Sequence, residues 1–480
     1  MSMRKLLLFS LIPFLGFAQV QIGSDIQGVT DGDGFGSAVS LSSNGNVLAV
    51  GALYSGTGYV RVYRNLSGAW TQIGASIDGE INSESDSRVV SLSSDGNVIA
   101  IGSRTNSGNG FLAGHVRVFR NISDTWTQIG NDIDGNEGDA SGFSISLSSD
   151  GTVLAIGAPS YSGNTNGSVR VYQNISSNWT QVGSNIIGEA LGDYCGWSVS
   201  LSDDGNVLAI GAPYNNGNGG DSGHVQIYRK ISDVWTQLGS DINGEQSNDY
   251  FGWSVSLSSN GSVVAIGAPY NDNANGVNYG HVRMYQNISD VWTQIGPDID
   301  GDVYGHSFGY YTSLSSDGTL VAIGAQNQNT SLSSRISLYR NISGNWIQVG
   351  VEIMTSTLDV TQGDSIVSLA SDGSKIAVGT PRLIDDSTGI VKVYDLTSIL
   401  SSKDLVLSNF TIYPNPATDK VNIQLNENLQ LEKVNIYNTL GQLIKTVKTA
   451  TISVADLAKG NYFLEVVTNK GKANKPIIVE

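Results

Sequence analysis

Residues 251–301 read FGWSVSLSSNGSVVAIGAPYNDNANGVNYGHVRMYQNISDVWTQIGPDIDG, and variants of this stretch fill the first four-fifths of the 480-residue chain. The leucine of its Ser-Leu-Ser element recurs at intervals of 51 to 57 residues. These leucines are Leu41, Leu92, Leu147, Leu201, Leu257, Leu314 and Leu369. A nearly fixed period of this length is the signature of a repeat architecture. The fold is therefore decided by what one copy forms.

One copy predicts four short antiparallel strands and no helix. Ser254 to Ser258 alternates polar and apolar residues, which is typical of a half-buried strand. Asn260-Gly261 predicts a tight hairpin, and the apolar run from Val263 to Ala268 predicts a strand buried on both faces. His281 to Tyr285 and Val291 to Ile295 are the third and fourth strands. Such a sheet cannot bury both faces alone, so we expect the copies to stack around an axis as the blades of an all-β propeller.

The two ends of the repeat region are incomplete in complementary ways. Residues 19–28 read as a fourth strand with no repeat before it. The seventh copy stops after its third strand, Val391 to Tyr394. We therefore expect the N-terminal strand to complete the last blade and to close a seven-bladed β-propeller over residues 19–396. Closure removes the free edges that an open array would expose.

The repeat disappears after a predicted linker at residues 397–408. Residues 409–480 have a different pattern, with strand signals at Val421 to Leu425, Lys433 to Tyr437 and Pro476 to Val479. A segment of about 70 residues can fold independently. We expect a small immunoglobulin-like β-sandwich here.

The N-terminus predicts export. Arg4 and Lys5 precede the apolar run from Leu6 to Phe17, and small residues end at Ala18, so residues 1–18 read as a signal peptide. This run is too short and wrongly flanked to span a membrane, and no later run reaches the roughly 18 apolar residues of a transmembrane segment. The single cysteine, Cys195, excludes an intramolecular disulfide.

The charge of the chain limits its partners. The formal net charge is −17, and residues 19–403 contain 16 Lys and Arg against 36 Asp and Glu. Such an acidic surface argues against nucleic acid or anionic lipid as a partner. Solubility outside the cell and capture of cations are the two interpretations that remain.

Two short motifs are shared by several copies. Phe251-Gly252 is followed by Gly267-Ala268-Pro269, and Phe35-Gly36 is followed by Gly51-Ala52-Leu53. On these residues the repeats resemble the FG-GAP family of β-propellers, the kind that forms the head of integrin α chains. The resemblance covers roughly residues 20–396 and implies the propeller fold, although fold by itself does not give function.

The sequence departs from this family in one respect. Calcium-binding members carry an Asp-x-Asp-x-Asp-Gly loop between strands one and two, where alternating carboxylates converge on the ion. Here that loop is Ser-Ser-Asp-Gly or Ser-Ser-Asn-Gly, so the family's calcium sites do not carry over and no cofactor is expected. Acidic pairs instead precede the first strand of several blades, where we expect solvated loops, with Ca²⁺ binding as the alternative. These pairs are Asp31 and Asp33, Glu137 and Asp139, Glu189 and Asp193, and Glu245 and Asp249.

A second resemblance lies at the C-terminus. Its motifs are Tyr413-Pro414-Asn415-Pro416, then Gly441, and then Gly460 with Tyr462. On these residues, segment 409–480 resembles the type A sorting domain of the type IX secretion system. The resemblance implies the type IX machinery as a partner. It also implies a secreted protein that is anchored at the outer-membrane cell surface or released.

Residues with catalytic potential are few. His115, His224 and His281 share one repeat position, Gly-His-Val, so we expect them to pack or cap rather than to converge on a metal; His306 is the fourth histidine. Cys195 replaces the repeated Phe and should be buried. The repeated Trp-Thr-Gln tryptophans predict a structural belt between blades. No catalytic motif is present, which favours a protein that is not an enzyme.

The long and varied loops between strands two and three and between blades predict the binding face. Aromatic rings there offer stacking area, and carboxylates can orient hydroxyls or a cation. The candidates are Trp197, Trp253, Tyr194, Tyr250, Tyr214, Tyr270, Asp193, Glu245 and Asp249. The alternative for Tyr214 and Tyr270 is that they only cover the blade ends.

The predicted function is binding or adhesion at the cell surface, with an extracellular glycan or protein as the partner. Two alternatives stay open. One is an extracellular hydrolase or lyase that acts on polysaccharides, because propellers also host such sites; it would need a non-repeated cluster of catalytic residues at the axis. The other is a purely structural envelope protein.

Overall fold

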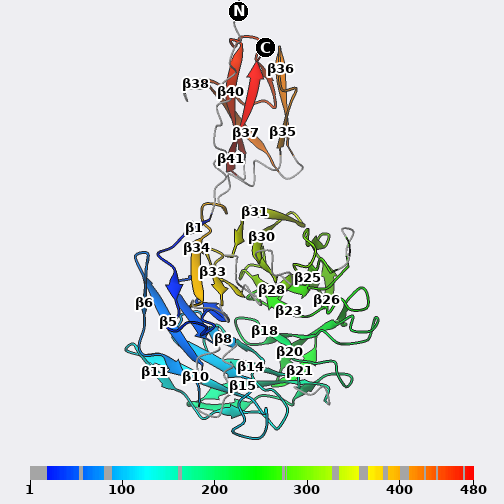
Figure 1. The fold of residues 1–480 in the computed structure, drawn as a ribbon. Coiled ribbons are helices and arrows are strands. Elements are labelled where there is room, and N and C mark those ends of the chain that lie inside the picture. Colours follow the sequence, from blue (N-terminus) through cyan, green and yellow to red (C-terminus); the bar gives the residue numbers. More distant parts are fainter. Residues whose placement is uncertain are drawn as a thin grey trace, which may run out of the picture.

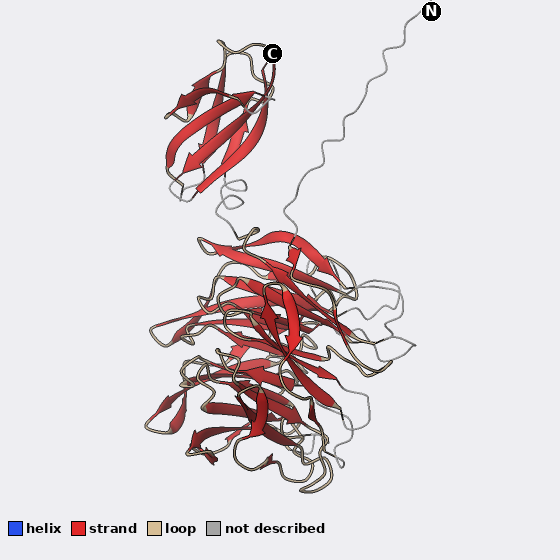
Figure 2. Cartoon of the chain, turned by 90° about the vertical axis from the view of Figure 1, so that its left-hand side faces the viewer, coloured by secondary structure: helices blue, strands red, loops and turns tan. Residues whose placement is uncertain are grey.

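The structure is a computed structural model. It describes residues 19–52, 58–80, 89–160, 165–272, 276, 278–326, 334–355, 366–381, 388–400, 410–425, 429–438, 442–468 and 471–479. All regular elements in these residues are β-strands (Figure 2), which confirms the all-β prediction. No helix in this part of the chain is long and apolar enough to cross a membrane. The predicted signal peptide, residues 401–408 of the predicted linker, and Gly441 lie outside the described residues.

Seven sheets occupy the repeat region, and each runs outward from a short inner strand. The inner strands are β3 (Ala38–Leu41), β8 (Val89–Leu92), β13 (Ser144–Leu147), β18 (Ser198–Leu201), β23 (Ser254–Leu257), β28 (Phe308–Leu314) and β32 (Ile366–Leu369). The second strands are β4 (Val47–Ala52), β9 (Val98–Ser103), β14 (Val153–Ala158), β19 (Val207–Ala212), β24 (Val263–Ala268), β29 (Leu320–Ala325) and β33 (Lys375–Thr380). The third strands are β5 (Tyr59–Leu66), β10 (His115–Ile122), β15 (Ser168–Ile175), β20 (His224–Ile231), β25 (His281–Ile288), β30 (Arg335–Ile342) and β34 (Ile390–Asp395).

The outermost position of each sheet holds the fourth strand. In chain order these strands are β6 (Ala69–Gln72), β11 (Thr125–Gln128), β16 (Asn178–Gln181), β21 (Val234–Gln237), β26 (Val291–Gln294) and β31 (Asn345–Met354). In the seventh sheet this place is taken by β1 (Val20–Gln21), which pairs antiparallel with β34 in the register Val20 to Asp395. The first strand of the chain thus lies beside the last strand of the repeat region.

Six of the seven sheets contain one strand more than the four predicted. A two-residue fifth strand follows the fourth and pairs with the start of the third. These strands are β7 (Ile77–Asp78), β12 (Ile133–Asp134), β17 (Ile186–Ile187), β22 (Ile242–Asn243), β27 (Ile299–Asp300) and, in the seventh sheet, β2 (Ile26–Gln27). In the sixth sheet, the long β31 covers both positions. The sequence analysis missed this strand because the Gly before it separates it from the Trp-Thr-Gln run.

The inner strands close a ring through one repeated hydrogen bond. The amide N–H of Leu92 donates to the hydroxyl of Ser40 in the preceding sheet, at 3.1 Å. The same bond joins every neighbouring pair, and the bond from Leu41 to Ser368, at 3.0 Å, joins the first sheet to the seventh. Figure 1 shows β18, β23 and β28 near the centre of the ring and β21 and β26 toward its rim.

Apolar residues of neighbouring sheets form the core between them. One such cluster contains Ala209 of β19 and Val225 of β20 from one sheet. Val255 of β23 and Val264 of β24 join it from the next sheet, and Phe251 lies fully buried in the same cluster. Burial of the repeated Phe, which the sequence analysis assumed for the position that Cys195 occupies, is thereby confirmed.

The tryptophans of the fourth strands connect neighbouring sheets. The indole N–H of Trp292 donates to the carbonyl of Leu238 in the preceding sheet, at 2.9 Å. Five further tryptophans repeat this bond at 3.0 to 3.2 Å, and they are Trp70, Trp126, Trp179, Trp235 and Trp346. The predicted belt between blades is confirmed, because a buried indole N–H needs a partner and finds it in the next sheet.

The hairpins between strands one and two are held by a short side-chain network. Asp95 accepts hydrogen bonds from the Ser93 hydroxyl at 2.6 Å and from the Asn97 amide at 2.9 Å. Burial acts to raise the pKa of Asp95, but these hydrogen bonds outweigh burial and leave the pKa below its ordinary value of 3.8. The pKa values of the equivalent aspartates are lowered in the same way, and these are Asp150, Asp204 and Asp317.

We expect these four turns to make the protein sensitive to acid. A carboxylate whose pKa is depressed by folding stabilises the folded state above its unfolded pKa, and this stabilisation is lost as the pH falls through the folded pKa. Replacing all four aspartates with Asn should therefore reduce the loss in free energy of unfolding between about pH 5 and about pH 3. Asn44 and Asn260 already occupy this turn position in two other sheets. Urea titrations at the two pH values measure the effect, and an equal loss in both proteins would contradict it.

The C-terminal segment forms two antiparallel sheets of its own. One contains β35 (Phe410–Tyr413), β36 (Lys420–Leu425) and β39 (Thr451–Ser453), and the other contains β37 (Leu431–Asn438), β38 (Leu443–Val447), β40 (Gly460–Thr468) and β41 (Gly471–Val479). A single core joins them, with Val421 and Ile423 from the first sheet and Ile436 and Leu464 from the second. This is the layering of a β-sandwich.

Candidate functional site

Two tryptophans predicted from the sequence lie side by side in neighbouring sheets. Trp197 and Trp253 immediately precede β18 and β23, and their ring centroids are 4.7 Å apart with an angle of 53° between the planes. Both side chains are half-buried. The starts of adjacent inner strands are neighbours around the ring, so large side chains placed there must meet.

The row of rings extends further than the sequence analysis predicted. Phe143 lies 4.6 Å from Trp197, and Tyr310 lies 5.0 Å from Trp253, measured between ring centroids. All four residues stand four positions before the leucine of the Ser-Leu element. Alignment of the copies on that leucine would have found Phe143 and Tyr310. The sequence analysis missed them because it located this position from the Phe-Gly motif and considered only the copies that hold a tryptophan there.

The four predicted tyrosines form a second row beside the first. Tyr194 contacts Tyr214 at 4.7 Å, Tyr214 contacts Tyr250 at 4.9 Å, and Tyr250 contacts Tyr270 at 5.2 Å, measured between ring centroids. The rows touch where Tyr214 lies 5.7 Å from Trp197. The structure therefore brings all six predicted aromatic residues together. We call the eight residues of the two rows the aromatic arc.

A cavity of about 490 Å³ lies at the axis of the ring, beside this arc. It is lined by residues at or near the start of all seven inner strands, and the inner row of the arc forms part of its wall. Arg104 and Pro381, which follow second strands, also line it. These residues place the cavity toward the face that carries the loops between strands two and three. The volume falls within the range of ordinary small-molecule sites, about 300–1,000 Å³.

Two of the predicted carboxylates, those of Asp193 and Asp249, are buried within the loops that precede β18 and β23. Asp193 is fully buried and accepts hydrogen bonds from the Ala190 amide at 2.9 Å and from the Asn215 side chain at 3.0 Å. Asp249 is 2% exposed and accepts a bond from the Gln246 amide at 2.9 Å.

Asp33, a member of another acidic pair, is also fully buried and accepts backbone hydrogen bonds. The acidic pairs were expected to be solvated, but Asp193 and Asp249 are buried because they satisfy backbone donors of their own loops. They shape the loops that hold the tyrosines.

Tyr194 and Tyr250 have an unusual backbone. Their φ angles are +55° and +54°, in the left-handed region that bulky residues rarely adopt. Ala140 holds the equivalent position in a neighbouring repeat with a φ of +53°, so the conformation belongs to the loop rather than to the tyrosine. Both tyrosine rings remain in the arc, where they contact Tyr214.

Two phenols of the arc, those of Tyr214 and Tyr250, are protonated at neutral pH. Burial, with smaller contributions from the neighbouring tyrosines, raises the pKa of Tyr214 to about 12. Burial also raises the pKa of Tyr250. The hydroxyls of these two tyrosines can therefore donate and accept a hydrogen bond.

Glu245, the ninth predicted residue, belongs to a different site. It lies with His281 and Asp298 in a group whose ligand atoms are within 4.8 Å of one another. Two equivalent groups occur, Glu80 with His115 and Asp132, and Glu189 with His224 and Asp241. The histidines do not converge on one another, but each lies close to two carboxylates, which the sequence analysis did not foresee.

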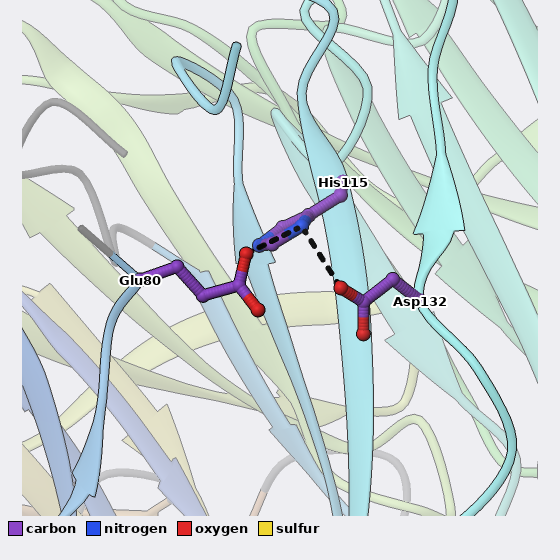
Figure 3. A group of neighbouring side chains, drawn as sticks. All are labelled: Glu80, His115 and Asp132. Atoms are coloured by element: carbon purple, nitrogen blue, oxygen red, sulfur yellow. Dashed lines mark ion pairs between the residues drawn. The ribbon is translucent and has the colours of Figure 1, made fainter. Parts of the chain in front are cut away.

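The geometry of these groups is shown in Figure 3, where His115 lies between Glu80 and Asp132. The Nδ1 atom of His115 is 4.0 Å from Glu80 Oε2 and 3.7 Å from Asp132 Oδ2. Burial lowers the pKa values of His115 and His224, and it lowers the pKa of His281 to about 3. One imidazole nitrogen and two carboxylate oxygens are ligand types that suit a divalent transition metal ion.

The remaining residues with catalytic potential are enclosed. Cys195 is 1% exposed, and burial raises the pKa of its thiol to about 12, so the prediction that it is buried and not a nucleophile is consistent with its position. His306 is 4% exposed, and neither ring nitrogen has a hydrogen-bond partner among the described residues.

Asn415, Gly460 and Tyr462 of the predicted sorting motif lie beside β41 of the C-terminal sandwich. Asn415 bonds to β41 twice, accepting from the Ile478 amide at 2.8 Å and donating to the Pro476 carbonyl at 3.1 Å. Tyr413 ends β35, and Gly460 begins β40. The hydroxyl of Tyr462 donates to the Ala458 carbonyl at 2.9 Å. Pro414 and Pro416 flank Asn415, and Gly441 is outside the described residues.

Comparison with known families confirms both resemblances. The FG-GAP repeat matches residues 188–228 and 243–283. The secretion system C-terminal sorting domain matches residues 411–480. This sorting domain indicates secretion through the type IX system to the cell surface or beyond. No curated protein matches the chain.

Solved β-propeller structures are similar to this chain at low sequence identity. A periplasmic gluconolactonase of Pseudomonas aeruginosa is 14% identical, with 90% of this chain and 98% of that chain covered and a TM-score of 0.50. The Cps50 (Swd1) β-propeller domain of Myceliophteria thermophila is 9% identical, with 78% and 99% covered and a TM-score of 0.49. At 14% identity the likeness to the gluconolactonase concerns the fold alone.

Proposed function

We propose that this secreted propeller with FG-GAP repeats binds an uncharged glycan at the aromatic arc, with one end of the glycan in the axial cavity. The observation that carries the proposal is the continuous double row of rings beside a cavity on the ring axis. Flat apolar faces with polar edges suit sugar rings, which present C–H groups on their faces and hydroxyls at their edges.

The composition of the cavity wall supports binding rather than catalysis. Among the described residues that line it, Arg104, Tyr310 and Tyr311 are the ones with ionisable side chains. Carboxylates and imidazoles, which serve acid–base catalysis in glycoside cleavage, would have to come from outside this lining. The net charge of −17 also disfavours polyanionic glycans.

The backbone of the arc adds a second line of support. Tyr194 and Tyr250 hold left-handed backbone conformations that cost free energy for a residue with a large side chain. Such strain is found at binding sites more often than elsewhere. Because Ala140 adopts the same conformation in a neighbouring repeat, the loop does not require a large side chain there, and the presence of tyrosine at both positions favours a role in binding.

The test is to measure the affinity of the purified protein for neutral polysaccharides. Quenching of tryptophan fluorescence reports the binding. Trp253→Ala should weaken binding by about 2 kcal/mol, or roughly 30-fold, because central aromatic residues dominate such interfaces. Trp197→Ala should act similarly. Circular dichroism should show that both variants keep the fold.

Ile288→Ala provides the matched control. Ile288 is 55% exposed and ends β25, at the turn between strands three and four on the opposite face. Its replacement should leave the affinity unchanged. Unchanged affinity in both tryptophan variants, or weaker binding in the Ile288 variant alone, would remove the arc from the binding site.

A further inference from the structure

Three boundaries between neighbouring sheets contain the same three side chains in the same arrangement. In each, the histidine begins a third strand and the aspartate precedes the fifth strand of the same sheet, while the glutamate follows the fifth strand of the preceding sheet. The histidine side chains are 1 to 3% exposed. Their Nδ1 atoms lie 3.7, 3.9 and 3.6 Å from the aspartate Oδ2 atoms.

No ordinary hydrogen bond accounts for the buried imidazoles. The ring nitrogens of His115, His224 and His281 make no hydrogen bond to the described residues, since the nearest carboxylate oxygens lie beyond 3.5 Å. Nε2 of His281 is also buried without a partner in this part of the chain, although it is Nδ1 that faces the carboxylate. Buried polar groups are otherwise nearly always paired.

The aspartates are held in position by a second residue. Gln128 donates to Oδ1 of Asp132 at 2.7 Å, which leaves Oδ2 facing the histidine. Gln237 and Gln294 hold Asp241 and Asp298 in the same way, each at 2.6 Å. Outer hydrogen bonds of this kind orient the ligands of metal sites.

Two of the glutamates also lie near an arginine. Arg283 contacts Glu245 at 3.3 Å, and Arg117 lies 4.0 Å from Oε1 of Glu80. In the second case the histidine faces the other oxygen, Oε2. An arginine and a metal ion can therefore share this carboxylate, one at each oxygen.

The other repeats provide an internal comparison. In the sixth sheet the histidine position holds Arg335, which forms ion pairs with Asp302 and, at 3.2 Å, with Glu352 at the two carboxylate positions. In the first and third sheets the position holds Tyr59 or Ser168, and both carboxylates are replaced. The replacing residues are Val29 and Ser76 in the first sheet, and Asn136 and Asn185 in the third.

Paired carboxylates therefore accompany either a guanidinium or a histidine at this position. Arg335 supplies the positive charge itself. Asp132, Asp241 and Asp298 have only Gln and His side chains as partners among the described residues. Where both carboxylates are present, this position therefore holds either a residue that carries its own positive charge or a histidine that can ligate a metal ion.

We propose that the three Glu–His–Asp groups each bind one divalent transition metal ion of the zinc class, ligated by Nδ1 of the histidine and by the two carboxylates. Zn²⁺ lies about 2.0–2.2 Å from such ligands, which sets tetrahedral ligands about 3.4 Å apart. The Nδ1–Oδ2 separations of 3.6 to 3.9 Å are wider than this, and all ligand atoms of each group lie within 4.8 Å, so binding would draw the three side chains together. The imidazole ligand selects against Ca²⁺, which takes oxygen ligands. Each ion would join two neighbouring sheets.

Equilibrium dialysis of the purified protein against Zn²⁺, with metal analysis, tests the proposal. The unmodified protein should bind three ions per chain, and His281→Arg should bind two. The variant with all three histidines replaced by Arg should bind none. Arginine is the matched replacement, because Arg335 shows that this position accepts it within the fold. Circular dichroism checks that the variants are folded.

Two further experiments complete the test: a variant that should bind an additional zinc ion, and competition between Zn²⁺ and Ca²⁺. Arg335→His should add a fourth ion, since Asp302 and Glu352 remain. Ca²⁺ at the same concentration should not displace Zn²⁺. Zinc retained by the triple Arg variant, an unmodified protein that binds no zinc, or full displacement by Ca²⁺ would each overturn the proposal.

Discussion

Deleting residues 19–28 is expected to open the seventh sheet and to destabilise the propeller by on the order of 5 kcal/mol or more. These residues provide β1 and β2, which both pair with β34. Ile22 donates its amide N–H to the Val393 carbonyl at 2.7 Å, and its own carbonyl accepts the Trp70 indole N–H at 3.1 Å. The deletion removes these bonds and exposes the edge of β34, so we expect aggregation as well.

Point variants separate ring closure from chain length. Ile26 is 7% exposed in the core between the first and seventh sheets, so Ile26→Ala should cost about 2–5 kcal/mol. Val20 is 60% exposed on the neighbouring strand, and Val20→Ala should have almost no effect. Urea unfolding measures the free energy of unfolding of the deleted protein and of the two point variants, each compared with the intact protein. A deleted protein that unfolds at the same urea concentration as the intact one would refute the role of this strand in closure.

Removing residues 410–480 is expected to abolish delivery beyond the outer membrane while leaving the propeller folded. This segment matches the secretion system sorting domain. Its core consists entirely of its own residues, from Phe410 to Val479, so the propeller cores lose nothing when it is removed. In its native host, the truncated protein should accumulate in the periplasm.

Fractionation and protease treatment of whole cells measure this outcome. The full chain should be accessible from outside or present in the medium, and the truncated chain should be protected until the outer membrane is opened. Resistance of the truncated protein to limited proteolysis in lysates checks that the propeller is folded. Normal amounts of truncated protein outside the cell would show that the segment does not direct export.

The candidate sites could be predicted only in part. Trp197 and Trp253 were found because tryptophan stands out in a repeat, whereas Phe143 and Tyr310 are visible only when the copies are aligned on a common leucine. The buried positions of Asp193 and Asp249 could not be predicted, because burial depends on which backbone donors the folded loop presents.

The sequence by itself determined the repeat, the first four strands of each copy, the complementary ends and the C-terminal segment, because hydrophobic periodicity and turn residues act locally. Only the tertiary structure decided which residues meet across sheets. Strand β10 pairs with β12, which the sequence did not predict, and His115 lies opposite Asp134 in this pairing. The pairing brings Asp132, which immediately precedes β12, close to the His115 side chain. Glu80 arrives from the preceding sheet. Contacts between neighbouring blades depend on how the sheets pack around the axis, which no local pattern records.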